Sequence, residues 1–178
     1  MQKEVHIRKG TLEDFYRLHW AWYKDGPTQQ VFAGRIQRGT QEFWVIEPKL
    51  ECHHTQSGEH RELMGEFHIV WESPDKDEAD GKGRAYLCAF RTHPDYRGQG
   101  LGTALMRAVL SRVKEAGRTE VTIGVEKDRP RVKEFYQKWG FTDVIKVKNI
   151  DHHNFSCRGE PNYAKAPIEL LLKQLDWS

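Results

Sequence analysis

The feature that most constrains the fold of this chain is a strand, a glycine-rich turn and a helix in direct succession. The run Ala85–Thr92 is densely apolar, which is typical of a buried central strand. From Leu101 to Val113, apolar residues recur every four positions, which predicts one face of an amphipathic helix that ends at Gly117. Such an element pair predicts a sheet with a helix packed across it.

The remaining periodicity predicts a mixed sheet with helices on both faces. The chain order is strand, two helices, three strands, helix, strand, helix and two strands. Strands joined without helices favour an antiparallel meander, and strand–helix–strand units require parallel crossovers. The expected strands cover residues 5–7, 42–47, 63–71, 85–92, 119–125, 141–147 and 168–175. The expected helices cover residues 12–22, 28–38, 101–116 and 131–139. Irregular loops are expected at residues 48–62, 73–84 and 149–163.

Composition and charge exclude several classes of protein. Twenty aromatic side chains can fill a core, and 28 Lys and Arg against 26 Asp and Glu leave a formal charge of +2. That balance gives no electrostatic case for a nucleic-acid partner. The chain shows neither a signal peptide nor an apolar stretch that could span a membrane. Its three widely spaced cysteines suit a reducing cytosol, so we expect a cytoplasmic protein of one domain, residues 1–178, without a membrane partner.

The turn between the apolar strand and the helix has the chemistry of a phosphate site. Glycines at alternate positions let the backbone approach a ligand closely, and the amides that begin a helix have no intrahelical acceptor. Together with the helix dipole and Arg97, these amides favour a phosphate or diphosphate. The alternative is a glycine-rich turn without a ligand. The spacing matches neither the Walker A motif nor the dinucleotide fingerprint, since Gly81-Lys82 is followed by Gly83 and positions 103 and 105 are not glycine.

This segment resembles a known family. Arg97-Gly98-Gln99-Gly100-Leu101-Gly102 is similar to the Arg/Gln-x-x-Gly-x-Gly/Ala signature of the GNAT superfamily of N-acetyltransferases, and the segment from Phe135 to Phe141 is similar to a second family motif. The resemblance spans about residues 85–147. It implies an α/β fold of about seven mostly antiparallel strands with a parallel central pair. It also implies acetyl-coenzyme A (acetyl-CoA) as co-substrate, bound by Phe90, Thr92, Arg97, Gly98, Gln99, Gly100, Leu101, Gly102 and Thr103.

The chain departs from the family pattern before the second motif. The family often has Asn seven residues and Ala four residues before its Tyr, where this chain has Arg129 and Val132. Arg129 is therefore a candidate for a cofactor phosphate, with a plain surface arginine as the alternative reading.

The resemblance also implies catalytic roles. It assigns the polarisation of the thioester carbonyl to backbone amides near Phe90, and the protonation of the leaving thiolate to Tyr136. No residue is an obvious base for the attacking amine. Glu66 and His68 are the candidates by position, because both alternate with Phe67 and must point to one face of a strand. An ordinary solvated strand face is the alternative for each.

These observations predict an N-acetyltransferase that acts on a primary amine of a small molecule, by direct attack in a ternary complex. A protein N-terminus or lysine is the alternative acceptor, and a non-catalytic acyl-CoA-binding module is the alternative class. The loops 48–62 and 149–163 are expected to shape the acceptor site. The His and Cys residues around 52–60 and 152–157 lack a paired Cys-x-x-Cys knuckle, so we expect no metal. A homodimer is expected by analogy with the family.

Overall fold

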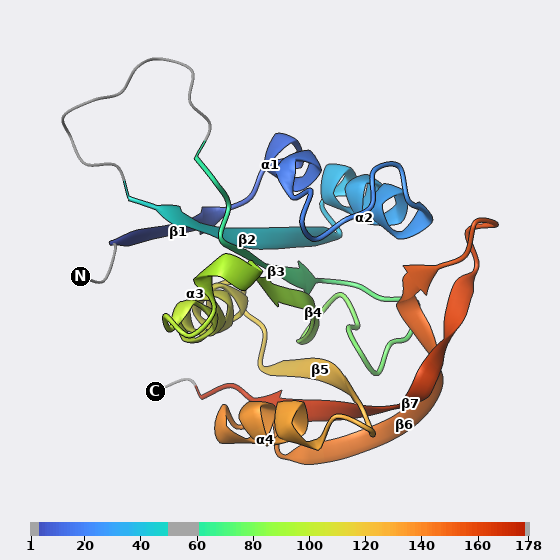
Figure 1. Ribbon diagram of the computed structural model, residues 1–178. Helices are drawn as coiled ribbons and strands as arrows, with labels where there is room; N and C mark the ends of the chain where they lie inside the picture. The colour runs from blue at the N-terminus through green and yellow to red at the C-terminus, as the bar shows by residue number, and fades with distance from the viewer. Residues whose placement is uncertain (1–3, 50–60, 177–178) are drawn as a thin grey trace.

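The computed structural model describes residues 4–49 and 61–176, and these form one seven-stranded sheet (Figure 1). The strand order is β1-β2-β3-β4-β5-β7-β6; β4 and β5 pair in parallel, and the other neighbouring strands pair antiparallel. The predicted mixed sheet with a parallel central pair is confirmed. The strands are β1 (Val5–Lys9), β2 (Gln41–Pro48), β3 (Gly65–Val70), β4 (Arg84–Thr92), β5 (Glu120–Glu126), β6 (Asp143–Phe155) and β7 (Pro161–Gln174).

Helices cover both faces of the sheet, as the sequence predicted (Figure 1). The helices are α1 (Leu12–Arg17), α2 (Pro27–Arg38), α3 (Leu101–Glu115) and α4 (Pro130–Lys138), and a short 3₁₀ turn (Pro94–Tyr96) precedes α3. Because side chains alternate along a strand, β2 sends Phe43 and Val45 toward α1 and α2, and Ile46 toward α3. Each face therefore has its own buried apolar cluster.

Helix α1 is shorter than the apolar spacing predicted. It begins as expected at Thr11, whose hydroxyl accepts from the amide of Asp14 at 3.2 Å while the Asp14 carboxylate accepts from the amide of Thr11 at 2.8 Å. It ends at Arg17 instead of continuing to Trp22. The Trp20 indole donates to the Leu63 carbonyl at 3.1 Å. This tertiary hydrogen bond stabilises a non-helical conformation of the segment after α1.

The largest correction concerns residues 149–163, which the sequence analysis assigned to an irregular loop. They are part of a long hairpin of β6 and β7, which turns near Gly159 at φ +77° and rises beside α2 (Figure 1). The pairing register of this hairpin shifts three times, after Val144, Lys148 and Asp151. Each shift breaks the alternation of apolar and polar residues, so the pattern of a strand is lost from the sequence.

In the part of the chain that the structure describes, none of the helices has the length and apolarity to cross a membrane.

Candidate active site

Strands β4 and β5 separate partway along their length. Their parallel pairing runs from Arg84 opposite Glu120 to Leu87 opposite Ile123, and within these strands it goes no further. On its other side, β4 has a bulge: Glu66 pairs with Arg91 and His68 with Cys88, which leaves two residues opposite Phe67. One of these is Ala89, whose φ is +50°. The bulge turns β4 away from β5, so backbone groups of β4 beyond Leu87 face a gap.

A cavity of about 240 Å³ lies between this gap and the start of α3. Gly100 is the N-cap of α3 at φ +76°, Gly98 lies at φ +80°, and no side chain of residues 4–49 or 61–176 caps the helix. The first amides of α3 therefore lack both intrahelical and capping partners. The residues predicted to bind the co-substrate line this cavity, except Gln99 and Arg129: they are Phe90, Thr92, Arg97, Gly98, Gly100, Leu101, Gly102 and Thr103.

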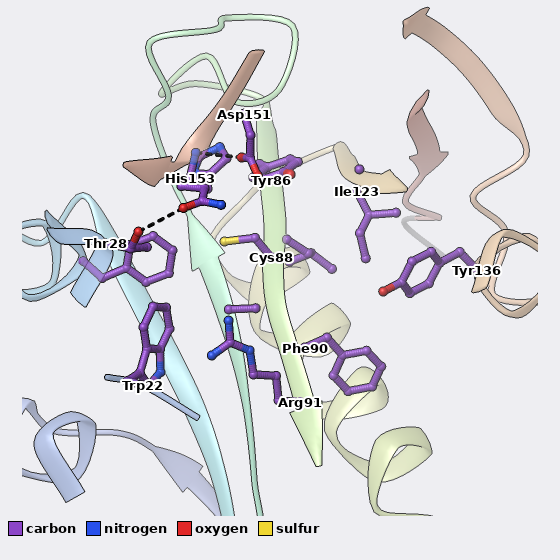
Figure 2. Close-up of a pocket in the computed structure, with 15 residues that line it drawn as sticks. Trp22, Thr28, Tyr86, Cys88, Phe90, Arg91, Ile123, Tyr136, Asp151 and His153 are labelled. Atoms are coloured by element: carbon purple, nitrogen blue, oxygen red, sulfur yellow. Dashed lines mark hydrogen bonds between the residues drawn. The ribbon is translucent and has the colours of Figure 1, made fainter. Parts of the chain in front are cut away.

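A second cavity, of about 330 Å³, lies on the other side of the gap (Figure 2). Its floor is the stretch of β4 from Tyr86 to Arg91. The aromatic side chains of Trp22 and Phe32 form one wall, Ile123 and Tyr136 form the opposite wall, and hairpin residues 151, 153 and 154 line the far end. Phe90 borders both cavities, so the two meet at the bulge of β4.

Tyr136 extends from α4 toward the second cavity, with its hydroxyl directed at the interior (Figure 2). The side chain is buried, and this burial raises the pKa of the phenol to about 12, although Arg129 acts in the opposite direction. The phenol is therefore neutral at physiological pH and available as a hydrogen-bond donor. Arg129 itself lines a smaller neighbouring cavity that also contains Tyr136, and it lies apart from the glycine loop.

Glu66 and His68 share one face of β3, as predicted, but both are completely buried. The indole N–H of Trp22 donates to the Glu66 carboxylate at 3.0 Å and lies between it and the second cavity. His68 Nε2 lies 3.3 Å from Glu66 Oε1, and its Nδ1 lies 2.9 Å from the side-chain nitrogen Nε2 of Gln41. Neither residue lines the cavities around the β4 bulge, and their role as a base stays a prediction.

We expect the change Glu66→Gln to affect stability more than catalysis. The carboxylate holds Trp22 in place, so its loss should lower the free energy of unfolding by about 1–3 kcal/mol. Since Glu66 does not line the cavity, kcat/KM should fall less than about tenfold. Steady-state kinetics measure this effect, and denaturant unfolding curves measure the loss of stability. A fall in kcat of about 100-fold or more, with a changed pH profile, would instead make Glu66 the base.

Comparison with known proteins identifies the family. A model of the acetyltransferase (GNAT) family matches residues 12–141, which include the glycine loop and Tyr136. This chain belongs to that family. The N-alpha-acetyltransferase 30 of Schizosaccharomyces pombe is 34% identical over 58 residues, a match that covers 33% of this chain and 39% of that relative. The chain thus matches about two fifths of the relative's length.

Solved structures with the same fold belong to GNAT enzymes. One is a GNAT family acetyltransferase from Elizabethkingia anophelis with acetyl-CoA bound, at a TM-score of 0.62 and 16% identity, covering 96% of this chain and 98% of that one. Another is a spermidine/spermine N-acetyltransferase from Vibrio cholerae, at a TM-score of 0.62 and 13% identity, covering 96% and 92%. The fold is therefore that of the family along almost the whole chain.

Contacts between α2 and the β6–β7 hairpin hold the far end of the second cavity. Arg35 donates from Nη2 to the carbonyl of His152 at 3.0 Å, and its Nη1 lies 2.9 Å from Nδ1 of His153. The Thr28 hydroxyl accepts from the amide of Phe155 at 3.1 Å. This part of the site could not be predicted from the sequence. Residues 149–163 lack the alternation typical of strands, so no pattern in them indicates that they lie over β4.

A cluster of acidic and histidine side chains behind the hairpin surrounds the ammonium group of Lys148. Ligand atoms of Asp75, Glu78 and His152 lie within 4.8 Å of one another. The ammonium of Lys148 is 2.6 Å from Asp75, 3.4 Å from Glu78 and 3.0 Å from Nδ1 of His152. These contacts lower the pKa of Asp75 to about 2, against the opposing effect of its burial. The cluster is a buried ion-pair network. The histidines predicted in the 48–62 loop at positions 53, 54 and 60 lie outside the described residues.

Proposed function

We propose that this chain transfers the acetyl group of acetyl-CoA to a primary amine of a small molecule, by direct attack in a ternary complex. The observation that carries the proposal is the meeting of the two cavities at Phe90. One has the donors for a diphosphate, and the other has room and polar groups for an acceptor. We also propose that residues 1–178 form one acetyltransferase domain, which the continuous sheet from β1 to β6 supports.

The glycine loop suits the diphosphate of the co-substrate. Free amides at the start of α3, the helix dipole and the guanidinium of Arg97 all favour an anion there. The edge of β4 from Phe90 to Thr92 offers backbone groups to an extended arm, since β5 does not pair with them. Bound acetyl-CoA would supply an activated thioester at the β4 bulge.

Each chemical task then falls to a group beside the gap. A backbone amide at the bulge, near Phe90, donates to the carbonyl oxygen of the thioester. Tyr136 holds a proton for the departing sulfur, because its buried phenol stays neutral. Trp22 and Phe32 form an aromatic wall that limits the access of water to the acceptor cavity.

The limited space at the far end of the second cavity supports a small acceptor over a protein. The hairpin is tied to α2 through Arg35 and Thr28, which fixes the wall of the cavity of about 330 Å³ at that end. Past Asp151, which lines both, this cavity adjoins a smaller one of about 140 Å³. A spermidine/spermine N-acetyltransferase among the structural neighbours agrees with this choice. The sequence similarity to an N-alpha-acetyltransferase, 34% identity over 58 residues, makes a protein N-terminus the second candidate for the acceptor.

The release of free thiol from acetyl-CoA tests the proposal. We expect turnover with at least one small primary amine, and kcat/KM values at least about tenfold lower for peptides with a free N-terminus or lysine. Preference for a peptide would establish the second candidate. Binding of acetyl-CoA without thiol release from any acceptor would identify a non-catalytic acyl-CoA-binding module and refute the proposal.

A further inference from the structure

The second cavity has opposite charges at its two ends (Figure 2). Asp151 lies at the end lined by the hairpin, beside Tyr86 and His153. Arg91 lies at the end near Phe90, where the two cavities meet. Between the ends, the lining includes the apolar or weakly polar side chains of Phe32, Cys88 and Ile123.

Asp151 is a fixed acidic group with unused acceptor capacity. Its Oδ1 accepts from the backbone amide of His153 at 2.9 Å, and none of the ion pairs between described residues involves it. The hairpin backbone around it is fixed, because His153 is held between Arg35 and Glu78, at 2.9 and 3.1 Å. Among the described residues the carboxylate forms no ion pair, in contrast to Asp75. Arg35 of α2 interacts with it electrostatically, and Arg129 lines the smaller neighbouring cavity with it.

Arg91 has the opposite effect at the other end. Its guanidinium carbon lies 4.4 Å from the centre of the Trp22 ring, and its Nη1 donates to the carbonyl of Ala21 at 2.5 Å. Its Nη1 also lies 4.0 Å from Oε1 of Glu66, so this buried carboxylate is already paired with a cation. Glu66 is therefore not available to an ammonium of the acceptor, whereas the guanidinium at the cavity surface disfavours a second positive charge nearby. A nitrogen close to Arg91 is therefore favoured in its neutral form, which is the form that attacks a thioester.

We propose that Asp151 binds a second, cationic group of the acceptor, so that the substrates are small diamines rather than simple monoamines. This inference rests on the proposed function. The charges of Asp151 and Arg91 favour different protonation states for the two nitrogens of the acceptor. The distal nitrogen is an ammonium on Asp151, and the reacting nitrogen is a neutral amine between Arg91 and Tyr136. The carbon chain between them lies against Phe32, Cys88 and Ile123.

Asp151 is thus a specificity-determining residue, and the test compares acceptors that differ only in the distal group. The acceptors are 1,4-diaminobutane, 4-amino-1-butanol and 4-aminobutyrate, with cationic, neutral and anionic ends. For the wild type, kcat/KM should be about 10- to 100-fold higher for the diamine than for the amino alcohol. This ratio corresponds to the free energy of one hydrogen bond between charged groups. The carboxylate-bearing acceptor should be the poorest.

The variant Asp151→Asn should remove this preference. We expect kcat/KM for the diamine to fall about 10- to 100-fold, and kcat/KM for the amino alcohol to change less than about threefold. The matched control is Asp143→Asn, since Asp143 is an exposed aspartate at the start of the same strand. Equal losses for all three acceptors, or a wild type that does not favour the diamine, would overturn the inference. If the variant does not fold, the ranking by the wild type decides.

Calorimetry separates this inference from the proposed function. If no acceptor releases thiol, 1,4-diaminobutane is titrated into wild type and Asp151→Asn in the presence of coenzyme A. Binding by the wild type that weakens about tenfold or more in the variant supports a cationic site at Asp151 without catalysis. Equal affinities, or no binding by the wild type, would overturn it.

Discussion

Tyr136→Phe is expected to lower kcat by about 100-fold or more while leaving the affinity for acetyl-CoA unchanged, because only the proton of the phenol is lost. The ring stays and keeps its contacts with Phe135 and Phe141. Steady-state kinetics and calorimetric titration of acetyl-CoA measure the two effects separately. Tyr163→Phe is the matched control, since Tyr163 is 81% exposed on the hairpin and should leave kcat unchanged.

The pH dependence gives a second readout of the same phenol. Tyr136 donates only when protonated, and burial raises its pKa to about 12. The donor form is therefore retained as pH rises through 10, where an ordinary tyrosine would begin to ionise. We expect no fall in kcat from this group between pH 7 and 10. Unchanged turnover in the Phe variant would remove Tyr136 from the mechanism.

Gly100→Glu should reduce the affinity for acetyl-CoA by at least about 100-fold. Position 100 lies at φ +76°, where a side chain costs about 1–2 kcal/mol, and the new carboxylate would stand at the start of α3. There it would interact with the helix dipole in place of a phosphate and repel the diphosphate. Calorimetric titration of acetyl-CoA into wild type and variant measures the loss.

The control for Gly100→Glu is a glycine with the same backbone strain at the other end of the helix. Gly117 lies at φ +82°, just beyond α3, and a Cβ there would meet nothing within 4 Å. Gly117→Glu should lower the free energy of unfolding at least as much, because its carboxylate would stand at the negative end of the helix dipole, but it should bind acetyl-CoA as the wild type does. Wild-type affinity in the Gly100 variant would mean that the loop does not hold the diphosphate.

Local patterns predicted the half of the site that is continuous in the chain. The apolar strand, the glycine turn and α3 follow one another, so their order in the chain predicted a phosphate site at the turn. The family resemblance then named most of the residues that line the first cavity. The second cavity joins α2, β4, α4 and the hairpin, and its far end depends on register shifts in β6. A bulge such as the one at Ala89 has no characteristic residue composition, so the separation of β4 from β5 could not be predicted from the residues of β4.

The position of bound coenzyme A, determined by crystallography of the complex, tests the central claim most directly. The expected complex has the diphosphate against the amides that begin α3, beside Arg97. Its thiol end should pass Phe90 into the gap between β4 and β5 and point at Tyr136. Coenzyme A bound elsewhere, or a gap filled by side chains while the nucleotide is bound, would contradict the claim.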